Sequence, residues 1–147
     1  MGNIHLIEMP TWECLQLLER CTIGRLAVME SGYPVALPIS YQLAKRPDAS
    51  IPLVVVRTRA GGVVERALGR AALEVDEIDV ERRRAWSVIV RGMLRPIDDT
   101  AGLPPPQPWL SDDRHRWLAL EPHVVTGRRF VGVEGQTFSV EWEYAQR

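Results

Sequence analysis

The chain has 147 residues with 18 basic and 19 acidic side chains, so its formal net charge at pH 7 is −1. This balance gives no electrostatic case for nucleic acid or an anionic membrane surface as a partner. No apolar run approaches the roughly 20 residues of a membrane helix, and the N-terminus lacks a signal-peptide pattern, so we expect a cytoplasmic protein. The length predicts a single domain over residues 1–147, which buries about two-thirds of the surface of its unfolded chain.

Residues 1–22 are predicted to form an N-terminal helical segment. Apolar residues repeat at helical spacing over 10–21, and Thr11 is the expected N-cap. Cys14 and Cys21 lie seven residues apart on this helix, which is about 10 Å along its axis. This distance is beyond disulfide reach, so we expect two free thiols that act as small apolar side chains in a reducing compartment.

Two predicted strands, 24–29 and 34–41, follow with a short polar connection at 30–33. This pattern predicts a hairpin. Pro38 interrupts the second strand and cannot donate a hydrogen bond to a ladder. It therefore marks a sheet edge or a bulge, where backbone groups are free for another partner.

The segment 53–67 is typical of a buried strand, a glycine turn and a short helix. The two glycines permit a tight turn with positive φ. Free N–H groups of the turn and the positive end of the helix dipole then point at one spot, where an anion such as a phosphate could bind. The P-loop and dinucleotide fingerprints are both absent, and the same pattern also occurs without a ligand. The candidate residues at this corner are Arg57, Thr58, Gly61, Gly62 and Val63.

Two further strands are predicted at 71–76 and 85–96, with a bulge or close backbone approach at Gly92. The acidic cluster in and after the first of them matches no calcium-loop spacing, and the three histidines show no metal-ligand spacing, so we expect a solvated turn over 77–84 and no metal. The cluster consists of Glu74, Asp76, Glu77 and Asp79.

The C-terminal third begins with a proline-rich loop at 98–108. One interrupted strand or two short ones are expected over 117–130, and 131–147 is an extension that could form a closing hairpin. Short strands joined by hairpins, with two or three small helices, predict a mainly β protein, a β-barrel with small helices.

Six short motifs occur in order along most of the chain, from about Thr11 to Phe130. They are Gly24-Arg25-Leu26-Ala27-Val28, Pro38-Ile39-Ser40-Tyr41, Val56-Arg57-Thr58, Leu73-Glu74-Val75-Asp76, Trp86-Ser87-Val88-Ile89-Val90-Arg91-Gly92 and Thr126-Gly127-Arg128-Arg129. Together this ordered set resembles the pyridoxamine phosphate oxidase-like family of flavin-binding split-barrel proteins, closest to its small actinobacterial-type members.

The resemblance implies a six-stranded antiparallel Greek-key split barrel that forms a homodimer, with FMN in clefts between the subunits. It also implies an oxidoreductase that exchanges electrons with a small-molecule donor or acceptor. Arg57 and Thr58 would hold the FMN phosphate above Gly61, Gly62 and Val63. The ring would lie along Pro38, Ile39 and Ser40, and Ser87 would approach it from the long strand. The partner subunit would add Arg128, with Trp109 and Trp117 as further candidates.

Two departures from the family pattern define the alternatives. Val63 stands where members usually carry a lysine, and a lost charge-assisted contact costs about 1.5–3 kcal/mol. Arg59 or Arg66 could compensate for this missing lysine. The second departure is Ser40, which stands where many relatives have asparagine. The alternatives to FMN are a deazaflavin cofactor or none, and the alternatives to an enzyme are a flavin carrier or a cofactor-free dimer. No residue is assigned as catalytic.

Overall fold

The computed structural model describes residues 5–97 and 115–132. Antiparallel strands dominate this part of the chain, as the sequence predicts. In order, the elements are β1 (His5–Met9), α1 (Thr11–Arg20), β2 (Ile23–Glu30), β3 (Tyr33–Arg46), β4 (Ala49–Arg59), α2 (Val63–Arg66), β5 (Gly69–Asp79), β6 (Arg84–Pro96) and β7 (His115–Val131).

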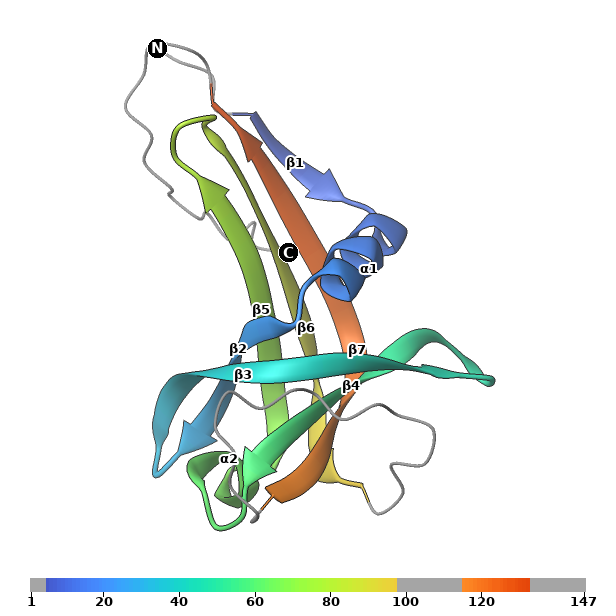
Figure 1. Cartoon of the computed structure of the whole chain (residues 1–147), viewed down its shortest axis with the longest axis vertical. Helices are drawn as coiled ribbons and strands as arrows, with labels where there is room; N and C mark the ends of the chain where they lie inside the picture. Colours follow the sequence, from blue (N-terminus) through green and yellow to red (C-terminus); the bar gives the residue numbers. More distant parts are fainter. Residues whose placement is uncertain (1–4, 98–114, 133–147) are drawn as a thin grey trace.

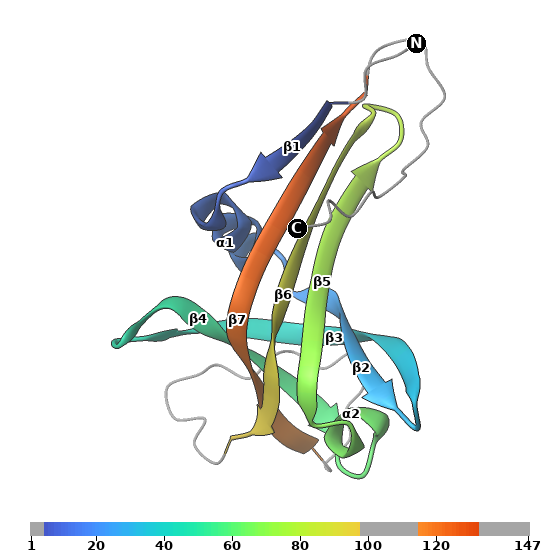
Figure 2. The ribbon, with the colours of Figure 1, turned by 180° about the vertical axis from the view of Figure 1, so that it is seen from behind.

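Six of these strands close into a barrel. Their order is β7-β4-β3-β2-β5-β6, and β6 pairs with β7 to complete the ring, while β1 pairs with the last residues of β7 on the edge opposite β6. Because β5 returns to lie beside β2, the strands β5-β2-β3-β4 form a Greek key. The long strands β5, β6 and β7 run together, and the β3–β4 ribbon crosses them (Figure 1 and Figure 2). The six-stranded antiparallel Greek-key split barrel is therefore confirmed.

β7 is one continuous strand, which decides between the two predicted arrangements of 117–130. It pairs with β4 over residues 115–120, with β6 over 118–131 and with β1 over 127–131. The β6–β7 register shifts between Arg91 and Gly92, which confirms the predicted bulge. A Cβ on Gly92 would clash with the carbonyl group of Glu121, so only glycine permits this close approach.

Three predictions are wrong at element ends. The strand predicted at 71–76 spans Gly69–Asp79, so the connection before β6 is short, and Glu77 and Asp79 lie within β5 rather than in a turn. α1 begins at Thr11, and its N-cap is Pro10, which has no side chain able to accept the N-terminal hydrogen bonds. β1 lies in the segment predicted to be helical, because its five residues carry no clear alternation and depend on β7 for pairing.

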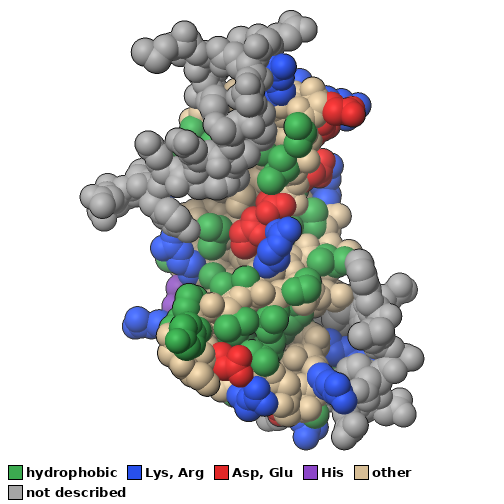
Figure 3. All heavy atoms as spheres, turned by 90° about the vertical axis from the view of Figure 1, so that its left-hand side faces the viewer, with side chains coloured by type: hydrophobic (Ala, Val, Ile, Leu, Met, Phe, Trp, Pro, Cys, Tyr) green, Lys and Arg blue, Asp and Glu red, His purple; other side chains and the backbone are tan. Residues whose placement is uncertain are grey.

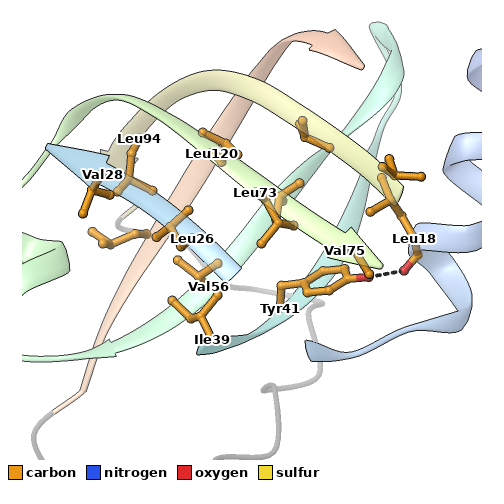
Figure 4. Packing of buried hydrophobic residues seen from close by; sticks show 14 of the residues in the cluster. Leu18, Leu26, Val28, Ile39, Tyr41, Val56, Leu73, Val75, Leu94 and Leu120 are labelled. Atoms are coloured by element: carbon orange, nitrogen blue, oxygen red, sulfur yellow. Dashed lines mark hydrogen bonds between the residues drawn. The ribbon is translucent and has the colours of Figure 1, made fainter. Parts of the chain in front are cut away.

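The barrel interior is apolar. Leu26, Leu73 and Leu120 are fully buried there (Figure 4), and no polar or charged residue is buried in the described part of the chain. Tyr41 also lies in this core, and its hydroxyl donates a 2.6 Å hydrogen bond to the carbonyl oxygen of Leu18. Burial raises the pKa of this phenol. The bond fixes α1 across one end of the barrel.

Both cysteines are free, as predicted, and Cys14 is fully buried against the barrel. Neither helix in the described ranges has the length and apolarity that a bilayer span requires. Within the same ranges no group of histidine, cysteine and carboxylate side chains could hold a metal ion.

Candidate functional site

The barrel opens between β3 and β4. Their pairing runs from Tyr41 opposite Val56 to the hairpin end. The part of β3 before Tyr41 pairs with β2, and the part of β4 after Val56 pairs with β7. Ser40 and Arg57 therefore lie on opposite sides of the opening, one residue beyond the last shared pair. Ser40 is predicted to contact the ring of the cofactor and Arg57 its phosphate, and the two residues are thus close together.

Arg57 has the features of an anion ligand. It is half-buried and lies opposite Trp117 in the β4–β7 ladder. Its guanidinium carbon stands 5.9 Å from the centroid of the Trp117 ring, which holds the guanidinium plane over an aromatic face. The Nε atom is buried and has no hydrogen-bond partner. A buried guanidinium donor without an acceptor is costly in a folded protein and is readily satisfied by a phosphate oxygen.

The turn after β4 is only partly as predicted. Gly61 has φ +74°, a conformation that favours glycine. Gly62 has φ −75°, so the predicted positive φ is wrong for this residue. Its N–H instead donates a 3.0 Å hydrogen bond to the carbonyl oxygen of Arg59. α2 then begins at Val63, as the sequence predicts.

This corner already holds a carboxylate from its own chain. Glu65 accepts the Gly61 N–H, and its other oxygen lies 3.3 Å from Nε of Arg116 on β7. Arg66 donates to the Gly61 carbonyl oxygen at 3.0 Å and to Glu30 at 2.9 Å. Neither Glu65 nor Arg116 was among the predicted site residues. The sequence shows that Glu65 follows closely after Gly61, but it does not show that Glu65 pairs with Arg116 on β7.

A second group of polar residues crosses the outer face of the barrel. Cα pairing places Arg25 between Pro38 on β3 and Glu74 on β5, and Asp76 opposite Ser87 on β6. Nη1 of Arg25 contacts Glu74 at 3.1 Å and Asp76 at 2.9 Å. The Ser87 hydroxyl donates to Glu74 at 3.2 Å. We call Arg25, Glu74, Asp76 and Ser87 the outer belt.

The outer belt reaches the predicted ring-binding strand. Ile39 is buried in the core, so strand alternation places Pro38 and Ser40 on the outer face. Three strand spacings, about 14 Å, separate β3 from β6 across the belt. Burial, followed by the neighbouring Asp76, raises the pKa of Glu74. Figure 3 views this side of the molecule, where apolar side chains surround a small charged group.

Arg128 lies at the other end of β7 from the corner. It is the cross-strand neighbour of Ser87, whereas Trp117 is the neighbour of Arg57. Eleven residues of strand separate Trp117 from Arg128, which corresponds to roughly 36 Å along an extended chain. The structure therefore brings Ser87 and Arg128 together but does not bring Arg128 to the corner of its own chain. Trp109, another predicted contact, lies outside the described residues.

Two hollows lie away from the corner. The larger has a volume of about 460 Å³ and lies between α1 and the β3–β4 ribbon, with Tyr41 and Gln42 in its wall. The smaller, about 380 Å³, lies beside Trp86 and Arg129 near the β5–β6 turn. Neither is lined by a residue predicted to bind the cofactor.

The comparisons with known proteins agree with this architecture. The family model described as pyridoxamine 5'-phosphate oxidase matches residues 10–129. The chain belongs to this family.

Three relatives cover nearly the whole fold. The uncharacterized protein Rv0080 of Mycobacterium tuberculosis is 27% identical over 138 residues, covering 86% of this chain and 87% of that protein. An FAD binding protein from Mycobacterium smegmatis is 27% identical with a TM-score of 0.66, covering 86% of this chain and 99% of that one. A conserved protein of unknown function from Corynebacterium diphtheriae has a TM-score of 0.71 at 24% identity, with 86% and 98% covered.

Proposed function

We propose that the chain is a flavin-dependent oxidoreductase that works as a homodimer and binds an FMN moiety at the opening between β3 and β4. In this proposal Arg57 anchors the phosphate next to the FMN ribityl chain. The ring follows the outer face of β3 at Pro38 and Ser40. The flavin family of the chain and the FAD binding described for the relative from Mycobacterium smegmatis both support a flavin cofactor.

The observation that carries the proposal is the state of Arg57. Its guanidinium is oriented by Trp117, its Nε is buried without an acceptor, and it stands one residue beyond the point where β3 and β4 separate. An oxygen of a bound phosphate supplies the missing acceptor. Thr58 follows on the same strand, and Gly61 turns the chain back towards the same corner.

A second copy of the chain is the proposed source of the remaining contacts. Arg128 cannot reach the corner of its own chain, but it can reach that of a partner whose barrel packs on the outer face. On that face exposed apolar side chains lie around the charged outer belt, and such patches mark interfaces. They include Met29, which is 55% exposed, together with the exposed residues Pro34, Ala36 and Pro38.

The bound flavin would supply the redox chemistry, taking or giving a hydride at its ring. The chain contributes anchoring of the phosphate, orientation of the ring along β3 and exclusion of water by the apposed barrel. Ser87 and Glu74 stand on the outer belt, where they can hold a polar edge of a ring or of a substrate. We assign neither of them a proton-transfer step.

One observation favours a second candidate, a dimer that has lost its cofactor. Val63 replaces the usual lysine, and the Glu65 carboxylate takes the Gly61 N–H. A corner filled by its own side chain requires no ligand.

Titration of the purified chain with FMN, FAD and a reduced deazaflavin, followed by absorbance and fluorescence, separates these functions. We expect FMN or FAD to bind with one flavin per chain, and the mass in solution to be that of a dimer. Reduction of the bound flavin by a nicotinamide or deazaflavin donor would support the oxidoreductase over a flavin carrier. Absence of binding by all three would overturn the proposal in favour of the cofactor-free dimer.

A further inference from the structure

We propose that Gln42 is a further cofactor-binding residue, which accepts a hydrogen bond from a sugar hydroxyl of the ligand beside the phosphate held by Arg57. The inference rests on the proposed function, because it concerns the same ligand at the same opening. Either the ribityl chain of a flavin or the adenosine ribose of FAD supplies such a hydroxyl, and the chemistry at Gln42 is the same in both cases. Gln42 was not among the site residues predicted from the sequence.

Gln42 and Arg57 are neighbours on the outer face of the barrel. Gln42 pairs with Val55, and Arg57 follows two residues later on β4, so the two are diagonal neighbours at the opening. Tyr41 and Val56 belong to the core cluster (Figure 4), so strand alternation turns the side chains of Gln42 and Arg57 outwards. Diagonal neighbours are about 7–8 Å apart in an antiparallel pair. A small polar group of a ligand can therefore contact both side chains.

Each of these two side chains has a buried polar atom without a hydrogen-bond partner. The atoms are the Oε1 acceptor of Gln42 and the Nε donor of Arg57. The same number of bonds joins each atom to its own Cα, so both can reach a similar height above the sheet. Val55 and Ala119, which pair on the same face, are fully buried. Unpartnered polar atoms in such surroundings are costly, and a ligand that satisfies them is favoured.

Arg46 also has an unpartnered buried Nε, but its environment differs from that of Gln42. Its Nη1 contacts a carboxylate oxygen of Glu121 at 2.6 Å, and its Nη2 donates to the carbonyl oxygen of Ile51 at 3.1 Å. Arg46 therefore ties β3 to β4 and β7 within its own chain. The Oε1 atom of Gln42 has no such tie and remains open to a ligand.

The two open atoms define the ligand group, because one is a donor and the other is an acceptor. A phosphate oxygen accepts from Nε of Arg57, but a second phosphate oxygen would repel the lone pairs of Oε1 on Gln42. A hydroxyl group satisfies Oε1, since it can donate. Gln42 is only half-buried, so rotation of its terminal amide brings Oε1 to the ligand. With hydrogen bonds of about 2.7–3.0 Å at each end, a phosphate oxygen and a hydroxyl of the adjoining sugar span the gap.

Substitution of Gln42 by methionine tests the inference, because methionine keeps the length of the side chain and removes the amide oxygen. The variant also loses an unpartnered buried acceptor, so its fold should remain stable. Dissociation constants are measured for lumiflavin, riboflavin, FMN and FAD with the parent chain and with Gln42→Met. A bond from the ribityl chain predicts that riboflavin, FMN and FAD all lose about five- to tenfold in affinity. A bond from the adenosine ribose predicts this loss for FAD alone.

Gln42→Glu tests whether the phosphate lies beside this residue, since a carboxylate keeps an acceptor and adds a negative charge. We expect repulsion to weaken the binding of FMN and FAD by about tenfold. Riboflavin, which has no phosphate, should bind no more weakly than it binds the parent chain. Unchanged affinity for FMN and FAD in Gln42→Glu would place the phosphate away from Gln42 and overturn the inference.

Gln16→Met is the matched control, because Gln16 is exposed on α1 and undergoes the same chemical change. It should change none of the dissociation constants. If Gln42→Met left all of them unchanged, or weakened lumiflavin as much as the other flavins, the inference would be wrong while flavin binding remained. A loss shared by FMN and FAD but not by riboflavin would place Gln42 against a phosphate and also overturn it. If the parent chain bound no flavin, the proposed function itself would fail before any variant was compared.

Discussion

The barrel interior and the corner at the end of β4 differ in whether their buried polar groups have hydrogen-bond partners. In the described interior all buried residues are apolar apart from the Tyr41 hydroxyl, which has its acceptor in the Leu18 carbonyl. At the corner Arg57 has a buried Nε without an acceptor, and Glu65 occupies the N–H of the turn. A region whose polar groups are internally satisfied serves folding, whereas one with an unsatisfied donor is ready for a ligand. Four predictions test whether the interior serves folding and the corner serves ligand binding.

Leu73→Ala has the largest expected effect, because Leu73 is fully buried at the centre of the core. Loss of a buried leucine side chain costs about 2–5 kcal/mol, through lost burial and the cavity that remains. Denaturation by urea at a fixed protein concentration measures this loss. Flavin affinity, corrected for the folded fraction, should stay within about twofold, which is less than 0.5 kcal/mol. A change in affinity as large as the change in stability would show that core and corner are not separate.

Arg57→Ala should produce the reverse pattern. The loss of a charge-assisted hydrogen bond costs about 1.5–3 kcal/mol of binding, which lowers flavin affinity roughly ten- to a hundredfold. Folding stability should change by less than about 1 kcal/mol, because the substitution also removes an unsatisfied buried donor. Fluorescence titration of the flavin gives the affinity, and urea denaturation gives the stability.

Arg20→Ala is the matched control for Arg57, since Arg20 is exposed in the last turn of α1. It should leave flavin affinity unchanged. Unchanged flavin affinity in Arg57→Ala would instead place the phosphate elsewhere and remove the main support for the proposed site.

The sequence predicted the barrel better than it predicted the corner. Short β-branched runs, the hairpin turn predicted within 30–33 and the bulge at Gly92 are local signals, and each appears in the structure where it was expected. β1 was missed because a short edge strand is specified by its neighbour, here β7, rather than by its own residues. The length of β5 was underestimated because charged residues on the outer face of a strand resemble a turn.

The corner was predicted through its local residues and not through its long-range partners. Arg57, Gly61 and Val63 are close in the sequence, so a strand, a turn and a helix start could be predicted from them. The pairing of Glu65 with Arg116 depends on the β4–β7 ladder. No sequence pattern indicates which arginine meets this carboxylate. The separation of Arg128 from the corner likewise depends on the continuity of β7.

Tyr41→Phe tests whether the buried hydrogen bond between Tyr41 and Leu18 belongs to folding alone. The substitution leaves the Leu18 carbonyl oxygen without its 2.6 Å donor, which costs about 1–2 kcal/mol when the acceptor stays buried. The loss should appear in the global denaturation midpoint and in faster amide exchange in α1, which this bond holds against the barrel. Flavin affinity should not change. A large decrease in flavin affinity would indicate that Tyr41 contributes to the site from within the core.

The smallest effect is expected at the outer belt and is a dependence on pH. Burial and the neighbouring Asp76 raise the pKa of Glu74, so the folded chain binds this proton more tightly than the unfolded chain does. Its ionisation therefore lowers stability as pH rises from the ordinary glutamate pKa through the raised one. We expect Glu74→Gln to gain stability relative to the parent chain over this window, measured by denaturation at a series of pH values.

Glu121→Gln provides a control of opposite sign for Glu74. Its hydrogen bond with Arg46 lowers the pKa of Glu121, so this carboxylate stabilises the fold above its ordinary pKa and the contribution is lost as pH falls through the lowered value. The parent chain should therefore be more stable than Glu121→Gln near neutral pH, and the difference should shrink on acidification. If both variants followed the same trend, the pH dependence would reflect overall charge, and the outer belt would not hold Glu74 in a distinct environment.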